Sequence, residues 1–538
     1  DVHGSRGLGD VYKRQFVNAL ESLRERCARD GTWSETLAAA RCLKAAGAGF
    51  PVDVHDVERA FYVSEAFARE CVGVDDECAH EWCVGLCALI DRYGEDLGGV
   101  VCHWEPMFAR VETFLQSDAK AYSGYGSCSA TRARYMTLVR KCRRFFPDGA
   151  ARAIWERVAE DCRATEDAKC FAGLGLLHLF TPCMQMSTPC SDELFFVEMM
   201  NGEWVTLSHA LGSSSFWTSG WISMFSQLAK HDLKGKINWK GVYDDMLTVT
   251  LRVMELPIGG IEGRRSFGRK VSFKAAMTFG SQLESRRVRT VAKLLVYRAM
   301  CDDAVVEYIA KIIDYIEHFY HPSSSGSFSG NLASFLRYLI KYTNKFVGYE
   351  KRVVRPEVLA RLVPVFKRIT DRAVFSKSSD LRRYAAIGIG RLAYMNPELI
   401  LPSVMSRFEE ALAHETATRQ LVPAMNCLTL CVRQIMLLPT NTIFQDDQEA
   451  YVNVSEFLAS ALNAALPGID VNDSSKTCAT LRFFCVVVTN LPRLVDVGEN
   501  GAVSCVPILW SEWTVHFLER LFTPVSYTHL RAHETHEH

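Results

Sequence analysis

Apolar side chains recur with the period of an α-helix in the C-terminal half of the chain. Between Val358 and Ile369 they fall at positions i, i+3, i+4 and i+7, and Pro356 stands where a first-turn proline belongs. Pro364 interrupts the run, and an internal proline kinks a helix because it lacks the backbone N–H. The pattern therefore predicts one amphipathic helix with a kink at Pro364.

Three further helices with the same period are expected downstream. Ser379 or Asp380 can cap the second helix, and Pro402 is expected to open the third. The fourth covers Thr416–Leu438, where Pro423 marks either a bend or a later start. Four helices in about 85 residues make two hairpins of roughly 40 residues each, the repeat length of HEAT and armadillo proteins. The expected fold is all-α, an α-solenoid of HEAT-like or armadillo-like helical hairpins.

A sharp corner at residues 466–473 separates two helix-like runs. Pro467 removes a backbone donor, and Gly468 tolerates a left-handed turn. Asn472 or Asp473 can then cap the first N–H groups of the next helix. The expected unit is helix, corner, helix, with flanking runs at Val454–Ala465 and Ser474–Leu491.

Two short motifs allow more than one interpretation. Residues 483–488 are aromatic and β-branched like a strand, but continuity with residues 477–481 favours a helix. Gly388 and Gly390 lack the third glycine and the preceding strand of a dinucleotide-binding fingerprint. We therefore expect these glycines to admit close packing between helices.

Loops are expected where turn-forming residues gather. Leu211–Trp221 combines glycine and serine with three aromatic residues, which either recognise a partner or anchor the connection onto its own scaffold. His321–Gly330 is the second expected loop, and it can cap a helix that begins near Asn331.

Composition and charge narrow the class of protein. The chain is 48% hydrophobic and 23% charged, which is typical of ordered globular proteins. Its 538 residues exceed what one core normally supports, so several domains or a stacked solenoid are expected. A net charge of -1 gives no global attraction to nucleic acid or anionic membrane, and no run approaches the roughly 18 apolar residues that span a bilayer. We expect neither direct nucleic-acid binding nor a membrane.

The 19 cysteines are scattered through apolar stretches, which favours a reducing compartment. One cluster contains Cys71, Cys78, His80, Cys83 and Cys87, whose side chains are of the kinds that bind zinc. Because it lacks the paired C-x-x-C spacing, a buried helix face is the preferred interpretation, and no metal site is expected.

The two ends of the chain follow no periodic pattern. Residues 1–15 and 525–538 look like translated adapter sequence, and we exclude both from the expected fold. The histidines of the C-terminal stretch have spacings found in metal sites, but adapter-derived sequence is the better interpretation. We expect the chain to be an internal fragment of a longer protein.

A basic, glycine-rich stretch covers residues 259–270. Arg264, Arg265, Arg269 and Lys270 could bind a polyanion such as a phosphorylated inositol or nucleic acid, whereas the common alternative is a solvated loop.

Catalytic motifs are missing from the interior of the sequence. There is no G-x-S-x-G, Walker A, H-E-x-x-H or kinase signature, and His103, His178 and His209 have no recognisable partner spacing. This favours a scaffold over an enzyme.

Four segments, in order, together resemble the middle region of the giant HEAT-repeat proteasome activators of the Blm-ten type, also called proteasome activator subunit four. The resemblance extends from about Gly202 to Thr523. The segments are Ile237–Asp245, His321–Gly326 with Phe335–Leu336, Leu392–Pro402, and Ala465–Asp473 with Lys476–Thr477.

The resemblance implies a non-catalytic regulator that caps the α-ring of the 20S proteasome core particle. Such activators promote ATP- and ubiquitin-independent entry of peptides and of unfolded or acetylated proteins, acetylated histones among them. Residues 16–201 would form the N-terminal part of the solenoid and residues 202–524 its HEAT-like middle region, so this chain would be part of the dome wall. A nuclear and cytoplasmic location and a role in DNA repair are also implied.

Two further expectations follow from the resemblance. No cofactor is required, but inositol phosphates bind narrow basic openings in the family, and the candidates here are the four cations of residues 264–270. Family members anchor through a terminal hydrophobic-Tyr-x tail, which this chain does not contain. A HEAT-repeat transport or assembly scaffold of the importin type, which binds partner peptides, is the alternative.

Overall fold

The structure is a computed structural model. It describes residues 2–46, 54–116, 127–183, 191–204, 215–232, 287–323, 328–347, 355–413, 418–438, 441–444, 450–470, 472–490 and 512–522, together with individual positions between 235 and 256.

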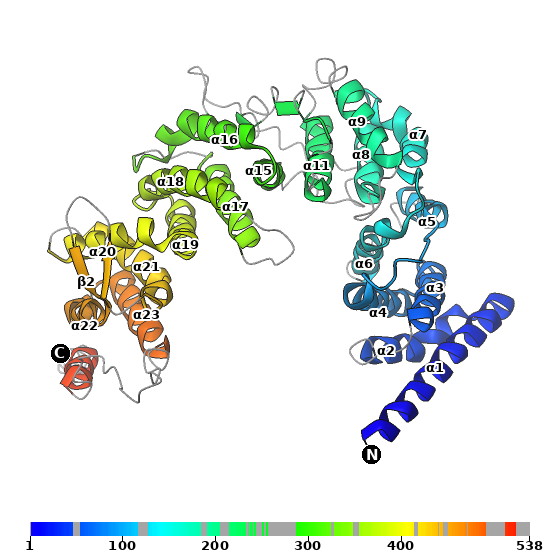
Figure 1. The fold of residues 1–538 in the computed structure, drawn as a ribbon, viewed down its shortest axis with the longest axis horizontal. Coiled ribbons are helices and arrows are strands. Elements are labelled where there is room, and N and C mark those ends of the chain that lie inside the picture. The colour runs from blue at the N-terminus through cyan, green and yellow to red at the C-terminus, as the bar shows by residue number, and fades with distance from the viewer. Residues whose placement is uncertain are drawn as a thin grey trace, which may run out of the picture. The chain divides into compact units, whose positions relative to one another are not determined.

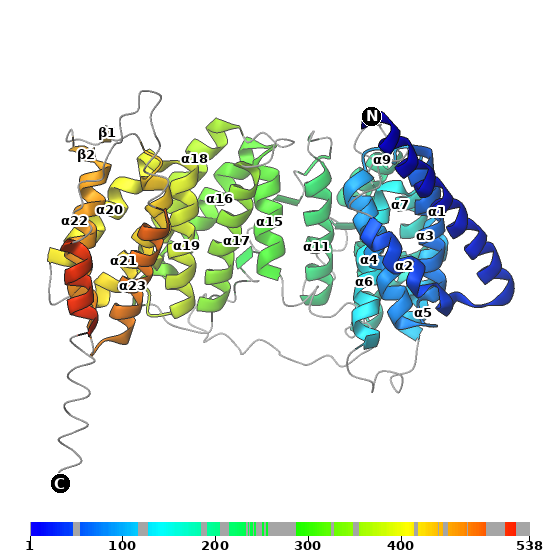
Figure 2. The same cartoon turned by 90° about the horizontal axis from the view of Figure 1, so that it is seen from below.

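The chain divides into two compact units. The first contains Asp1–Val249 with Arg265–Leu294, and the second contains Thr250–Arg264 with Leu295–His538. Within each unit, successive helices run back and forth and stack as hairpins in two layers (Figures 1 and 2). The predicted all-α solenoid is confirmed. None of the described helices is long and apolar enough to cross a bilayer.

In the first unit, helices that are two apart in the chain pack side by side, as α2 does with α4 and α4 with α6. Asp75 caps α4 because its carboxylate accepts the Cys78 N–H at 2.9 Å. Phe67 of α3 stacks on Trp82 of α4 with 4.5 Å between ring centroids, which closes this hairpin. The helices are α1 (Val2–Asp30), α2 (Leu37–Ala46), α3 (Val54–Cys71), α4 (Asp76–Tyr93), α5 (Trp104–Gln116), α6 (Ser127–Cys142), α7 (Ala150–Cys162), α8 (Asp167–Phe180), α9 (Ser191–Met199) and α11 (Ser215–His231).

In the second unit, α16, α18, α20 and α22 form the first layer, and α17, α19, α21 and α23 form the second layer. The division between the units falls within α15, and residues 512–522 are also helical. The helices are the C-terminal part of α15 (Arg287–Ala299), α16 (Asp303–Ile316), α17 (Ser329–Val347), α18 (Pro356–Ala373), α19 (Ser379–Met395), α20 (Pro397–Ala413), α21 (Thr418–Ile435), α22 (Val454–Ala465) and α23 (Ser474–Asn490).

Helix boundaries confirm most of the predicted pattern and correct two details. Pro364 and Pro423 lie inside α18 and α21, and α22 has the predicted bounds. The cap of α19 is Ser378, one residue earlier than predicted, because its hydroxyl accepts the N–H of Leu381 at 3.4 Å. The predicted start of α20 at Pro402 is also wrong. The helix already begins at Pro397, and the side-chain oxygen of Asn396 caps it by accepting the Leu399 N–H at 3.1 Å.

Two stretches expected to lack regular structure are partly helical. Residues 2–15 continue α1, since extending an existing helix is far easier than starting one. The sequence predicts a loop at 211–221, but α11 begins at Ser215, so the prediction is wrong for residues 215–221. Residues 205–214 lie outside the described part of the chain. Trp221 is fully buried and contacts Trp155 with 6.0 Å between ring centroids. This tryptophan anchors the scaffold.

One β-hairpin has no counterpart in the predicted pattern. Strand β1 (Asn441–Phe444) pairs antiparallel with β2 (Ala450–Asn453) between α21 and α22, with Asn441 opposite Asn453. Residues 483–488 lie within α23, so the helical interpretation of that stretch is confirmed.

The corner at residues 466–473 keeps its predicted cap but changes the role of its glycine. The Asp473 carboxylate accepts the Lys476 N–H at 2.9 Å and begins α23. Gly468 is not left-handed, so that prediction is wrong. A Cβ atom there would lie 2.2 Å from the Thr480 hydroxyl oxygen, and the glycine instead allows the corner to contact α23 closely.

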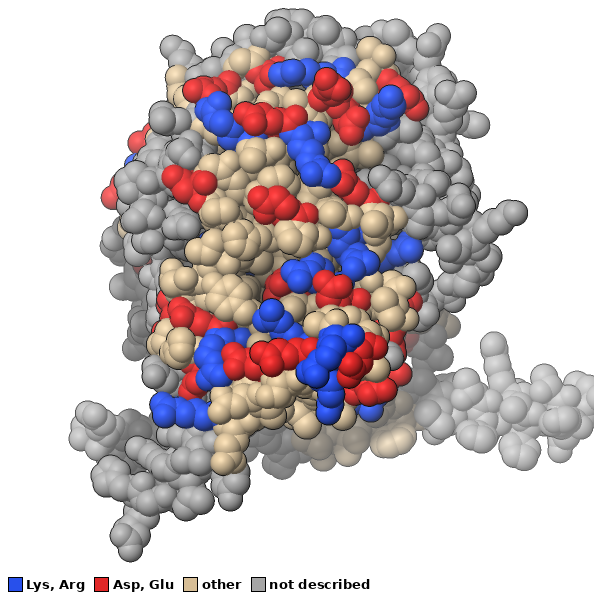
Figure 3. Space-filling view, turned by 90° about the vertical axis from the view of Figure 1, so that its right-hand side faces the viewer, with Lys and Arg blue, Asp and Glu red and all other residues tan. Residues whose placement is uncertain are grey.

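Ion pairs join helices that are two apart in the chain across the surface of the first unit. Arg59 of α3 pairs with Glu21 of α1, and Arg157 of α7 pairs with Glu112 of α5 at 2.7 Å. The face in Figure 3 accordingly shows Lys and Arg interspersed with Asp and Glu. Exposed pairs of this kind contribute about 0–1 kcal/mol each, so they align helices more than they stabilise the fold.

Gly388 and Gly390 confirm the predicted role in helix packing. A Cβ at Gly388 would lie 2.8 Å from the Ile340 side chain of α17, and one at Gly390 would lie 3.0 Å from the Leu430 carbonyl oxygen of α21. Helix α19 therefore contacts both its neighbours in the second layer at distances that only glycine allows without adjustment.

Gly390→Val is expected to lower the midpoint of thermal unfolding, because the added methyl groups would meet the α21 backbone and overpacking costs about 1–3 kcal/mol. Gly330→Val is the matched control, since nothing lies within 4 Å of a Cβ at that first-turn position of α17. Circular dichroism melting compares the two variants. Equal midpoints would contradict the close approach of α19 and α21.

Candidate functional site

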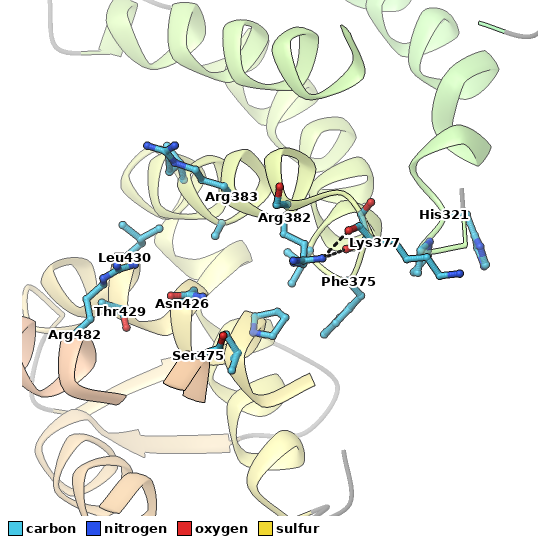
Figure 4. A pocket seen from close by; sticks show the side chains of 18 of the residues that line it. His321, Phe375, Lys377, Arg382, Arg383, Asn426, Thr429, Leu430, Ser475 and Arg482 are labelled. Atoms are coloured by element: carbon cyan, nitrogen blue, oxygen red, sulfur yellow. Dashed lines mark hydrogen bonds between the residues drawn. The ribbon is translucent and has the colours of Figure 1, made fainter. Parts of the chain in front are cut away.

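A groove runs along the second layer of the second unit. It lies where α19, α21 and α23 meet the corner that follows α18, and the turn at residues 321–323 closes one end (Figure 4). Its volume is about 1450 Å³. This exceeds the roughly 300–1,000 Å³ of typical small-molecule pockets.

The charge of the groove is strongly positive. Lys377, Arg382, Arg383 and Arg482 line it together with a single carboxylate, Asp473, which gives a formal net charge of +3. That carboxylate is already engaged as the cap of α23. Within the described ranges, no carboxylate lies at ion-pair distance from Lys377, Arg383 or Arg482. The excess is local, because the whole chain has a net charge of -1.

Arginines on the first layer of the same unit are paired instead. Arg355 meets Asp303 at 2.8 Å, and Arg407 meets Asp371 at 3.0 Å. These pairs join α16 to α18 and α18 to α20. Further pairs on this layer are Arg361 with Glu307, Arg368 with Asp314 and Glu317, and Arg372 with Glu317.

Apolar and neutral polar groups lie between the cations of the groove. Phe375, Ile387 and Leu430 are among its apolar lining residues, and Leu430 is 42% exposed. Asn426 and Ser475 add an amide and a hydroxyl, and neither side chain has a hydrogen-bond partner within the described part of the chain. The surface can therefore contact apolar, anionic and amide groups together.

Arg382 differs from the other cations because it holds the corner after α18. Its Nη1 donates to the carbonyl oxygens of Ser376 at 2.7 Å and Lys377 at 3.0 Å (Figure 4). These carbonyls follow the end of α18 and are not used by a helix. Arg382 thereby fixes the rim of the groove.

Positive charge continues beyond the groove along the second layer. Arg337 of α17 donates to the Tyr384 hydroxyl at 3.0 Å and lies over that ring. Burial lowers the pKa of Arg391, and the charge of Arg337 lowers it further. Cations on this layer are thus close enough to interact unfavourably.

The residues predicted from the sequence to bind a polyanion are not among those that the structure describes. Arg264, Arg265, Arg269 and Lys270 are outside the described residues, so their role stays a prediction. The groove itself escaped prediction because it combines residues from 321 to 482. Its one local signal was three cations between Lys377 and Arg383 at the start of a predicted helix.

The cysteine cluster forms a buried helix contact. The Cys71 thiol donates to the Cys78 sulfur at 3.6 Å, and this hydrogen bond lowers the pKa of Cys78 and raises that of Cys71. Burial raises the pKa of Cys83, and it raises the pKa of Cys87 to about 11. In the described part of the chain, no three His, Cys, Asp or Glu side chains could hold a metal ion.

Of the three histidines considered for catalysis, the structure describes two. His103 is exposed, His178 is half-buried in α8, and His209 lies outside the described residues.

Each of the two units is a stack of helical hairpins, the architecture of α-solenoid proteins, which present extended surfaces to partners. Comparison with known proteins shows which α-solenoid proteins the chain is similar to. Residues 309–534 match the family model described as the proteasome activator complex subunit 4, mid HEAT repeats region.

Relatives with that name cover more of the chain. Proteasome activator subunit 4 of Arabidopsis thaliana is 27% identical over 461 residues, which is 82% of this chain and 24% of that protein. Proteasome activator complex subunit 4 of Homo sapiens is 25% identical over 424 residues, covering 74% of this chain and 21% of that protein. Residues 309–534 thus match the mid HEAT-repeat region of this family, and most of the chain is similar to proteins named proteasome activator subunit 4. It spans about a quarter of the length of these relatives.

Arg382→Ala is expected to lower the midpoint of thermal unfolding, because two carbonyls at the α18–α19 corner lose a charged donor, a loss of about 1–3 kcal/mol. The neighbouring Arg383→Ala is the control, since Arg383 makes no hydrogen bond to the described residues. Differential scanning fluorimetry distinguishes the variants. An unchanged midpoint in Arg382→Ala would mean that the corner holds without this side chain.

Proposed function

We propose that this chain is part of an activator that caps the 20S proteasome core particle at its α-ring. The activator promotes entry of peptides and of unfolded or acetylated proteins, including acetylated histones, without ATP or ubiquitin. This chain forms part of the wall of the activator and supplies no catalytic groups. The observation that carries the proposal is the family match over residues 309–534, within a longer stretch of similarity to relatives named as proteasome activators.

The fold supports a role through shape and surface. A solenoid buries its core between neighbouring hairpins, so it can form a long wall without a single central core. We propose that the protein acts in the nucleus and the cytoplasm, and that DNA repair is one process in which it takes part.

The full-length protein that contains this chain is expected to co-purify with 20S core particles. It should also raise their hydrolysis of a fluorogenic peptide in buffer without ATP or ubiquitin, measured against core particles alone. A protein that neither co-purifies nor stimulates hydrolysis would refute the activator function. Capture of transport cargo peptides instead would favour the importin-type scaffold.

We also propose that the basic stretch at residues 259–270 binds inositol phosphates. Arg264→Glu combined with Arg265→Glu is expected to abolish binding of inositol hexakisphosphate in isothermal titration calorimetry, because two cations become anions. Arg26→Glu combined with Arg29→Glu, on the exposed side of α1, is the control for total charge. Unchanged affinity in the first variant would reject this site.

A further inference from the structure

We infer that the groove of the second unit, defined by Lys377, Arg383, Arg482, Asn426 and Leu430, binds an extended polypeptide segment that carries both acidic and apolar side chains. This goes beyond the proposed activator function, because it assigns a ligand class to a particular surface. Binding can be measured on this chain in the absence of core particles.

The charge argument rests on the contrast between the two layers. Arginines of the first layer meet carboxylates of neighbouring helices, as Arg355 does with Asp303. Lys377, Arg383 and Arg482 have no such carboxylate in the described ranges, although they line one groove. Like charges gathered on a surface repel one another unless a partner neutralises them. A partner with several carboxylates would supply the missing charges.

The apolar lining decides which kind of anion fits. A small polyanion would be served by cations alone, and it would gain nothing from Phe375 or Ile387. Leu430 projects from α21 with 42% of its surface exposed, so a partner that covers it removes apolar area from water. A polypeptide can carry acidic and apolar side chains on one segment, which favours it over a polyphosphate.

The neutral polar groups suit a peptide backbone. In Figure 4, Asn426 and Ser475 lie between Arg482 at one side and Lys377 at the other. A side-chain amide both donates and accepts, so Asn426 can bond to the C=O and the N–H of an extended chain. The volume of about 1450 Å³ leaves room for several residues.

The test measures binding of a fluorescein-labelled peptide, in which Glu alternates with Leu, to the whole chain. Fluorescence anisotropy of the peptide reports binding. Tight binding is expected at low salt, with weakening as ionic strength rises. Peptides that replace Glu by Gln, or Leu by Ser, should each bind about tenfold more weakly, a change that corresponds to about 1.4 kcal/mol. Equal binding of the Gln peptide would overturn the charge argument, and equal binding of the Ser peptide would overturn the apolar one.

The matched variants locate the binding site. Lys377→Glu combined with Arg482→Glu should weaken binding of the Glu-Leu peptide at least about tenfold. Leu430→Ser should weaken it by a smaller factor, and both variants should keep the unfolding midpoint of the unmodified chain. Arg26→Glu combined with Arg29→Glu changes total charge equally and should leave affinity unchanged. If the control loses as much affinity as the groove variant, or if inositol hexakisphosphate binds the groove while the peptide does not, the inference is wrong.

Discussion

Each helix depends on helices of the adjoining hairpins to bury its apolar face. Leu336 of α17, Phe366 of α18 and Leu392 of α19 have no exposed surface, and their helices contact one another across the two layers. No hairpin here could bury such side chains by itself, because a pair of helices covers only one face of each partner. Stability therefore accumulates through contacts between neighbours, and the chain needs no single central core.

That constraint explains the small residues and the ion pairs. Helices of the second layer approach closely enough that Gly388 and Gly390 have no room for a Cβ without adjustment of their neighbours. Ion pairs such as Arg407 with Asp371 then align helices of the first layer. The same packing leaves parts of α19, α21 and α23 facing the groove, where Lys377, Arg383 and Arg482 have no carboxylate partner among the described residues.

In the second unit, the two layers of helices use their charged side chains differently. The first layer of the second unit uses its charges internally, between α16, α18 and α20. The second layer leaves charge and apolar surface available to a partner. Because the apolar core lies between the layers, the first layer can be held by ion pairs while the second layer keeps a surface that can bind a partner.

The sequence by itself determined the class of fold, since a period of 3.6 residues with proline and glycine at corners has few solutions other than stacked helices. It also determined the bounds of α22 and the cap at Asp473, because capping depends on neighbouring residues only. Only the tertiary structure shows why position 468 is a glycine. A larger side chain would collide with Thr480, whereas the backbone conformation of the turn does not itself require glycine. The tertiary structure also decided the groove, because Lys377 and Arg482 lie far apart in the sequence and only the stacking of α19, α21 and α23 brings them to one surface.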